Sequence, residues 1–407
     1  MARRASADLR PVNAEQIVAT PLLIDGRATR RGQFGLALGR DAQGMKVLQV
    51  DGLDTLKRTF GKLPITTVDA ICPRPMNAHT HLDLSTYPHL RGDFAHFIAA
   101  MAKYRREHPQ ARGLAAASSG LGRLVSRAVA AVGDIVARDA VMVAELQRSP
   151  LAGVAYREVV CTEQAAAVPT LAALMQRLQA WRPMQRPDGP RVGLSPQSPY
   201  LVCKDLLRQM ARLSITEQVP LQIHVAESPS ELAFFQTGSG SLAQALSASG
   251  FRVPPSPASL GFQCDPALTP IRYLADIGFL DAAPTLVHCV NVTDEDIQII
   301  AEHRCPVITC TRSNANLQCG VFPWKKFEQA GVSVALATDS VASAHDIEIW
   351  HELDASLACH GPGLDLATAL EWLTVGASRA LGLAAMSIEV GCRLDDLTLF
   401  SRRPLVA

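Results

Sequence analysis

Histidine and carboxylate side chains recur where short apolar runs of the sequence end. His79 and His81 lie two residues apart in the segment NAHTHLDLS, and His224, His288 and Asp339 each close another apolar run. Residues i and i+2 of a strand point to the same face, so His79 and His81 can both face one cation. His224 and Asp339 would complete a shell of three nitrogens and one oxygen, with positions left open for water. The spacing therefore predicts a site for a divalent metal ion.

Each of these histidines, taken alone, is more often an ordinary buried or surface residue than a metal ligand. Together, however, they favour a metal site, because all of them fall at the ends of predicted strands, and one fold class brings such strand ends together. The remaining histidines lie in helical or loop sequence and are left outside the site, with the exception of His345, which is considered below: His89, His96, His108, His303, His351 and His360.

The elements that must position these residues are short β-branched runs separated by Ala- and Leu-rich helical stretches. Eight runs are expected to be strands, at residues 70–78, 131–137, 156–161, 191–197, 221–227, 284–290, 306–312 and 332–340. Alternation of strands and helices is typical of parallel α/β folds, and eight units predict a (β/α)8 barrel. Active sites of such barrels lie at the carboxyl ends of the strands, where the metal-competent residues occur.

Both ends of the chain have a different character. Residues 16–72 alternate apolar runs with turn signals, and residues 389–401 repeat this strand-like pattern. We therefore predict a barrel of residues 70–383 and a small β domain composed of residues 1–69 and 384–407. The first 16 residues are basic and are expected to be a frayed tail.

The composition excludes several classes of function. The 407 residues carry 39 basic and 38 acidic side chains, so no charge excess favours nucleic acid or a membrane surface as partner. No window has the apolar length of a membrane span, and the basic start lacks the apolar core of a signal peptide. We expect a cytoplasmic protein with a small-molecule substrate, and a homodimer is compatible with the sequence.

The ten cysteines form no C-x-x-C pair, so reduced thiols are expected. Cys305, Cys310 and Cys319 are loosely clustered, but their spacing matches no zinc template. Packing in the core is the better interpretation of these three side chains.

Five segments, NAHTHLDLS, SPQSPY, HVAES, TRSNANLQCG and ATDSVAS, are similar to motifs of the amidohydrolase superfamily. The resemblance is to its cytosine-deaminase-like branch of metal-dependent hydrolases, and it implies a distorted (β/α)8 barrel with a composite β domain. It also implies that His79, His81, His224 and Asp339 bind one divalent metal ion, with zinc as first choice and iron as the alternative. Relatives with two metals bridge them with a modified lysine on the fourth strand, and RVGLSPQSPY contains no lysine.

The resemblance further implies catalytic roles. Asp339 would take a proton from metal-activated water as hydroxide attacks an sp2 ring carbon, and Glu227 would protonate the adjacent ring nitrogen. His288 would hydrogen-bond the metal-bound water or the substrate. The alternative for Glu227 is an acidic residue that stabilises the start of a helix, since the segment ESPSEL follows.

Four further residues are candidates for binding the substrate. Gln197 and His345 stand where many relatives carry other residues, and Glu158 and Arg312 lie close to strand ends. A guanidinium such as that of Arg312 can pair with a carboxylate or phosphate in two-pronged geometry. The alternative for Arg312 is an exposed surface residue.

The expected activity is hydrolytic deamination of an aminopurine nucleoside or a 5′-substituted derivative. NAHTHLDLS and TRSN are most similar to deaminases of adenosine, methylthioadenosine, S-adenosylhomocysteine and aminodeoxyfutalosine, and aminodeoxyfutalosine of menaquinone biosynthesis is the preferred substrate. The same metal and acid would also serve a chlorohydrolase of triazine-like rings or a cyclic amidohydrolase. A catalytically inactive binding barrel is disfavoured, because every metal and acid position is present.

Overall fold

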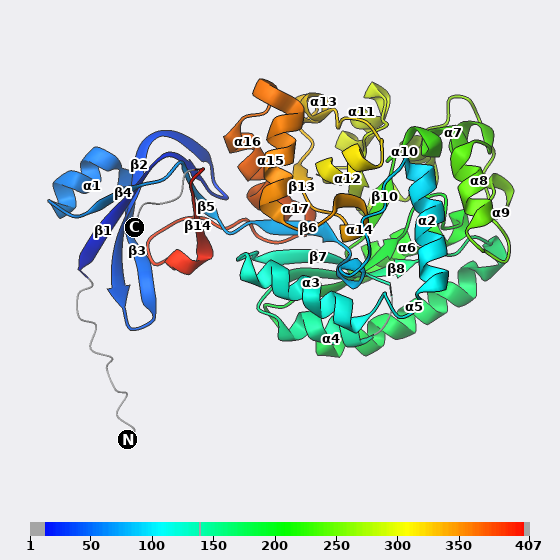
Figure 1. Cartoon of the computed structure of the whole chain (residues 1–407), viewed down its shortest axis with the longest axis horizontal. Helices are drawn as coiled ribbons and strands as arrows, with labels where there is room; N and C mark the ends of the chain where they lie inside the picture. The colour runs from blue at the N-terminus through cyan, green and yellow to red at the C-terminus, as the bar shows by residue number, and fades with distance from the viewer. Residues whose placement is uncertain (1–12, 138–139, 403–407) are drawn as a thin grey trace, which may run out of the picture. The chain divides into compact units, whose positions relative to one another are not determined.

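The computed structural model of the chain describes residues 13–137 and 140–402. The described residues divide into two compact units, one extending from Pro75 to Leu383 and the other formed by the chain on either side of it. The first of these units contains parallel sheets surrounded by helices, and the second contains a separate sheet (Figure 1). Most of the predicted frayed tail lies outside the described residues, but its last part is wrong, because Ala14 already begins a strand.

The separate sheet has six strands from both ends of the described chain, in the order β14-β5-β1-β2-β3, with β4 also paired to β1. Its members are β1 (Ala14–Ile24), β2 (Thr29–Asp41), β3 (Gly44–Gly52), β4 (Ile65–Thr67), β5 (Ala70–Pro73) and β14 (Leu397–Phe400). Strand β14 runs antiparallel to β5, with Leu399 opposite Ile71. Helix α1 (Leu53–Phe60) buries Leu56 against β1 and β2.

The larger unit contains two parallel sheets of four strands each, so the α/β prediction is confirmed. The first sheet holds β6 (Met76–Thr80), β7 (Ala131–Val136), β8 (Ala152–Val159) and β9 (Arg191–Pro196). The second holds β10 (Gln222–Val225), β11 (Thr285–His288), β12 (Val307–Thr309) and β13 (Val334–Leu336). Isolated parallel bridges join the two sheets at both edges, one between Leu194 and Leu221 and one between Thr80 and Asp339.

The eight parallel strands fall in or beside the eight predicted runs, with two differences. The first run, 70–78, is two strands in different sheets, because Pro73 and Pro75 lack the N–H that a continuous ladder needs. The third strand starts at Ala152, before the β-branched residues that marked its run. Small residues are required at the start of β8 because this strand lies between β7 and β9, and its backbone closely approaches that of β7. A Cβ on Gly153 would come within 1.9 Å of the Val132 carbonyl oxygen of β7.

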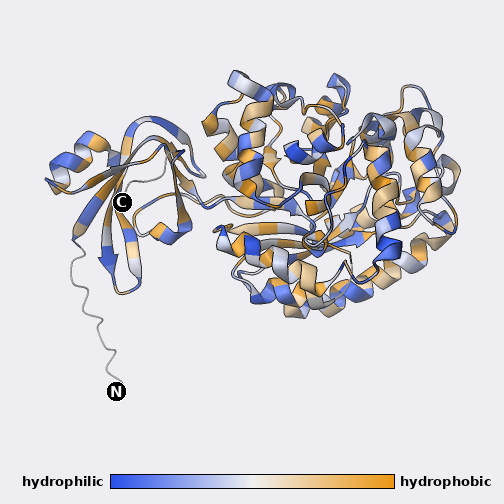
Figure 2. Cartoon of the chain, in the orientation of Figure 1, coloured by the Kyte–Doolittle hydropathy of each residue, from blue (hydrophilic) through white to orange (hydrophobic). Residues whose placement is uncertain are grey.

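The helices of the larger unit connect successive strands and lie around the two sheets (Figure 1). They are α2 (Phe94–Glu107), α3 (Leu114–Ser126), α4 (Ala140–Arg148), α5 (Ala167–Trp181), α6 (Lys204–Glu217), α7 (Pro229–Thr237), α8 (Ser241–Ala248), α9 (Pro257–Leu260), α10 (Pro270–Asp276), α11 (Asp294–Glu302), α12 (Thr311–Asn316), α13 (Trp324–Gln329), α14 (Val341–Ala344), α15 (Ile349–His360), α16 (Leu366–Glu371) and α17 (Ala377–Ala380). The parallel strands are largely hydrophobic whereas the surrounding helices are mixed (Figure 2), as expected for sheets covered on both faces. Apolar side chains from both sheets form one core, including Ile135, Val154, Tyr156, Val287 and Ile308.

No helix in residues 13–137 and 140–402 is long and apolar enough to cross a membrane. All ten cysteines belong to these residues, and all ten are free thiols. Cys305, Cys310 and Cys319 are buried, and the metal-competent cluster found among the described residues does not include them.

Candidate functional site

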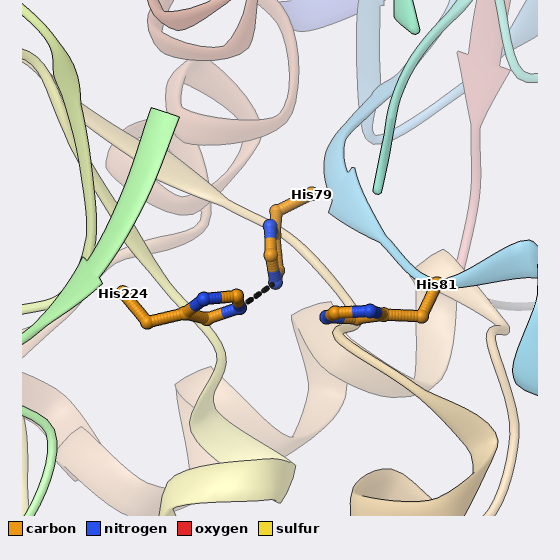
Figure 3. Close-up of side chains that lie close together, drawn as sticks. All are labelled: His79, His81 and His224. Carbon is orange, nitrogen blue, oxygen red and sulfur yellow. Dashed lines mark hydrogen bonds between the residues drawn. The ribbon is translucent and has the colours of Figure 1, made fainter. Parts of the chain in front are cut away.

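Three histidines converge at the carboxyl ends of β6 and β10. His79 belongs to β6, His81 follows that strand directly, and His224 belongs to β10. Their rings face a common point (Figure 3), and one possible ligand atom from each lies within 4.8 Å of the other two. All three side chains are buried. The structure therefore brings together the three histidines that the sequence assigned to one metal site.

Hydrogen bonds behind the rings determine which nitrogen of each imidazole faces this point. His79 Nδ1 lies 2.6 Å from Gln222 Oε1, and Gln222 Nε2 donates to the Ala78 carbonyl at 3.1 Å. The second bond orients the amide so that its oxygen faces His79, and His79 Nδ1–H must be the donor. His224 Nδ1 likewise donates to the Gln197 carbonyl at 2.7 Å. In the tautomer that donates from Nδ1, each of these rings presents the lone pair of Nε2 to the common point.

The distance between these two Nε2 atoms shows whether the histidines could bind one metal ion. His79 Nε2 and His224 Nε2 lie 3.2 Å apart (Figure 3), although neither carries a proton when both Nδ1 atoms donate. Two ligands at 2.0–2.1 Å from one ion at the tetrahedral angle are about 3.3–3.4 Å apart. Asp339 Oδ1 lies 3.6 Å from His79 Nε2 and 3.4 Å from His81 Nε2. These four side chains therefore fit a single divalent ion such as zinc.

Asp339 presents one oxygen to the histidines and has the other one held in place. Its Oδ2 accepts hydrogen bonds from Ser313 Oγ at 2.7 Å and Ser343 Oγ at 2.8 Å, which leaves Oδ1 to face His79 and His81. Burial by itself would raise the pKa of Asp339, but contacts with these two histidines hold it well below its usual value. The carboxylate is therefore ionised and oriented.

Glu227 and His288 lie beside this group. Glu227 Oε1 is 3.5 Å from His288 Nε2, and His288 Nδ1 is 2.9 Å from Asn314 Oδ1. Burial raises the pKa of Glu227 well above its usual value, and the charges of Asp339 and Glu231 raise it further. Burial also lowers the pKa of His288 to about 3. Burial and the neighbouring charges thus favour a protonated Glu227 carboxyl group beside a neutral His288 imidazole.

The backbone leaves its strands in an unusual conformation at these positions. Ala226, His288 and Asp339 have φ angles of 51°, 77° and 58°, in the left-handed region that non-glycine residues rarely adopt. Each such residue costs of order 1–3 kcal/mol and persists where surrounding contacts hold it. The turn at Ala226 is held by Glu231, whose carboxylate accepts from the backbone N–H groups of Ala226 and Glu227. These turns, which the sequence did not reveal, direct the side chains towards one site.

A cavity of about 340 Å³ opens beside this group, a size typical of small-molecule sites. Its wall includes the side chains His81, His224, Glu227, His288 and Asp339. His79 is fully buried and does not line it. The predicted catalytic residues thus face a space that can hold a substrate.

Two of the four substrate-binding candidates, Gln197 and Glu158, line this cavity. Gln197 Oε1 is buried and has no hydrogen-bond partner within the described part of the chain, so it is available to a ligand. Glu158 Oε2 accepts from Arg112 Nη2 at 3.2 Å. Although burial opposes ionisation, Arg112 and Arg105 lower the pKa of Glu158, so the cavity wall contains a carboxylate.

The other two candidates, Arg312 and His345, do not line the cavity. Arg312 Nε donates to Glu352 at 2.7 Å and its Nη1 to Asp346 at 2.6 Å. The guanidinium is neutralised by Glu352 of α15 and by Asp346 in the loop that precedes this helix. His345 is exposed. The structure therefore gives Arg312 a role in holding the fold together.

Other functional side chains escaped the sequence reasoning. Ser313, Asn314 and Ser343 lie inside the quoted motifs TRSNAN and ATDSVAS, so those motifs were the available signal. Gln222 lies two residues before His224, and only the contact with His79 reveals its role. No sequence signal marks Arg112. Its Nε donates to Oδ2 of the buried Asp83 at 2.6 Å and so supplies a charged partner for that carboxylate.

The chain is similar in sequence to a family of known hydrolases and to two deaminases. Residues 76–401 match the amidohydrolase family model. The aminodeoxyfutalosine deaminase of Deinococcus radiodurans is 42% identical over 313 residues, which cover 77% of this chain and 73% of that protein. The 5′-deoxyadenosine deaminase of Methanothermobacter thermautotrophicus is 24% identical over 405 residues, 96% of this chain and 86% of that protein.

Among solved structures, the fold is similar to that of the Helicobacter pylori aminofutalosine deaminase in complex with methylthio-coformycin. The two superpose with a TM-score of 0.77 at 22% identity, covering 97% of this chain and 94% of that chain. The resemblance inferred from the five motifs is thus confirmed by a family match over most of the chain and by a relative of 42% identity. The chain belongs to the amidohydrolase family.

Proposed function

We propose that this protein is a mononuclear metal-dependent deaminase of 5′-substituted aminopurine nucleosides, with aminodeoxyfutalosine as its specific substrate. The observation that carries the proposal is the 42% identity to the Deinococcus radiodurans enzyme over 77% of the chain. The buried group of histidines, Asp339 and Glu227 beside a ligand-sized cavity supports it. The same identity favours deamination over the triazine and cyclic-amide alternatives.

His79, His81, His224 and Asp339 would hold the metal ion, with zinc as first choice and iron as the alternative. A bound divalent ion supplies Lewis-acid chemistry, because it lowers the pKa of a water from about 15.7 towards 7. Gln222 and the Gln197 carbonyl hold two of the rings in the tautomer that such an ion needs.

Two side chains, Asp339 and Glu227, then move the protons, and His288 contacts the oxygen that is added. Asp339 Oδ1 takes a proton from the attacking water while its Oδ2 stays bonded to two serines. Glu227, protonated in its buried position, donates to the ring nitrogen next to the carbon under attack. Asp339 passes its proton to the exocyclic amine, which leaves as ammonia, and the remaining proton of the added oxygen returns to Glu227 as the carbonyl of the product forms. His288, whose Nδ1 is bonded to Asn314, offers Nε2 to the oxygen that adds to the ring.

Gln197 and Glu158 would bind the nucleoside, since both line the cavity and Gln197 Oε1 lacks a partner within the described residues. For the fold, we propose a distorted (β/α)8 barrel of residues 75–383 and a composite β domain of residues 1–74 and 384–407; the boundary predicted at residue 70 moves to Pro75 because β5 (Ala70–Pro73) belongs to the separate sheet. The bridges at both edges of the two parallel sheets and the pairing of β14 with β5 support this division. Ten free thiols support a location in the reducing cytoplasm.

The test is release of ammonia by zinc-loaded protein from aminodeoxyfutalosine, 5′-deoxyadenosine and adenosine, with triazines and cyclic amides assayed in parallel. Aminodeoxyfutalosine is expected to give the highest kcat/KM, and Asp339→Asn is expected to release no ammonia. Metal-loaded wild-type protein that deaminates no aminopurine nucleoside would overturn the proposal.

A further inference from the structure

One wall of the cavity is a face of helix α2, which packs beside α8 (Figure 1). Residues at spacings of three and four along α2 line the cavity: Phe94, Phe97, Ile98, Met101, Ala102 and Arg105. This spacing is that of a single helix face. Five apolar side chains are followed by one arginine, and at 1.5 Å per residue the face extends over about 16 Å. Leu246 and Phe251 add apolar surface from α8 and the loop that follows it.

Three arginines line this cavity, and they differ in what they bind. Arg112 is held by two carboxylates, Asp83 and Glu158. Arg106 donates from Nη1 to the Ser249 carbonyl at 3.0 Å. Arg105 makes no hydrogen bond or ion pair with any residue in the described ranges, and it reaches solvent at the cavity.

The charge balance of this wall favours an anion. Apart from the metal ligands and Glu227, whose neutral form is favoured by burial, the charged side chains of the cavity are Arg105, Arg106, Arg112 and Glu158, and Asp83 neutralises Arg112 from behind. Three positive charges therefore face two negative ones, which leaves an excess of one positive charge. Partial removal from water lowers the pKa of Arg105, and the nearby charge of Arg112 lowers it further. A bound anion would relieve both effects.

We propose that Arg105 determines substrate specificity by binding a carboxylate at the end of an apolar 5′ substituent of the nucleoside. The inference rests on the proposed function and narrows it to substrates whose arm carries one net negative charge. The apolar face of α2 would contact an aromatic or aliphatic arm, and the unpaired guanidinium would bind the carboxylate. An arm ending in both an ammonium and a carboxylate is neutral and would be disfavoured.

The experiment compares three substrates: aminodeoxyfutalosine, its carboxyl methyl ester and 5′-deoxyadenosine, which lacks the arm. They are assayed with wild type, Arg105→Met, Arg105→Lys and the control Lys103→Met. Lys103 is an exposed cation of the same helix, paired only loosely with Glu107 at 3.9 Å and absent from the cavity wall. Its removal changes the net charge of α2 by the same amount without changing the cavity.

Arg105→Met is expected to lower kcat/KM for aminodeoxyfutalosine by about 10- to 100-fold, the effect of losing a hydrogen bond to a charged group. The loss should appear mainly in KM, Arg105→Lys should recover part of it, and the ester should lose less than about threefold because it has no charge to pair. Lys103→Met should match wild type. Equal losses for all three substrates, or no loss for the carboxylate substrate, would overturn the inference.

A binding measurement separates this inference from the proposed function. Calorimetry with the deaminated product of aminodeoxyfutalosine and with its methyl ester requires no turnover. Tighter binding of the free acid, lost in Arg105→Met, supports the inference even if wild type releases no ammonia. Wild type that deaminates aminopurine nucleosides but binds the acid and the ester equally well would refute the role of Arg105 and leave the deaminase intact.

Discussion

Replacement of Gln222 by leucine tests whether the rings are arranged for a metal ion. Gln222 is fully buried, accepts from His79 Nδ1–H at 2.6 Å and donates to the Ala78 carbonyl at 3.1 Å. Leucine has a similar size and no polar atoms. The variant therefore leaves the His79 N–H without its partner and no longer determines which ring nitrogen faces the other ligands.

The magnitude follows from the orphaned donor. A buried polar group that loses its partner costs about 1–3 kcal/mol, and at about 1.4 kcal/mol per factor of ten this is roughly 5- to 150-fold in affinity. Loss of an outer partner of a ligating histidine typically weakens metal binding by about 10- to 100-fold. We expect Gln222→Leu to weaken zinc binding within this range, measured by competition with a chromophoric chelator.

Gln147→Leu is the matched control. Gln147 is also buried, and it accepts from the Arg186 backbone N–H at 2.9 Å and donates to the Pro190 carbonyl. Both variants should lower the thermal midpoint, but only Gln222→Leu should weaken zinc binding. If the two variants bind zinc with the affinity of wild type while Gln222→Leu folds normally, the inferred role of the hydrogen bond to His79 is refuted.

Two further predictions concern groups whose pKa is raised by burial. Glu227→Gln keeps the shape of the side chain but removes its acidic proton, so kcat should fall by about 10²- to 10⁴-fold while the metal content stays unchanged. Ammonia release and metal analysis measure these two quantities, and a variant with wild-type activity would contradict the role of Glu227 as the acid. Burial raises the pKa of Asp134 from 3.8 to about 8, so its protonated form stabilises the fold at low pH and this stability is lost as pH rises from about 4 through about 8. Urea midpoints at about pH 5 and pH 9 should therefore differ more in wild type than in Asp134→Asn, and equal differences would show that Asp134 does not titrate in this way.

The strands could be predicted because each parallel strand is a local run of apolar residues. All eight fell in or beside a predicted run, and the errors arose where local signals fail: Pro73 and Pro75 split one run, and Ala152 and Gly153 begin a strand without β-branched residues. The candidate catalytic residues could be predicted because they stand at the ends of these runs. The sequence suggested Arg312 as the arginine that binds the substrate, but its guanidinium forms ion pairs with Glu352 and Asp346.

The sequence by itself determined which side chains close the strands: three histidines, Asp339, Glu227 and His288, with motifs specific enough to indicate the family. Tertiary structure alone decided how these groups are held and which arginines line the cavity. The bond from His79 to Gln222 spans 143 positions and the one from Ser313 to Asp339 spans 26, so no local pattern records them. The direction of a long side chain such as that of Arg105 or Arg312 depends on the elements packed around it, and only the folded chain brings those elements together.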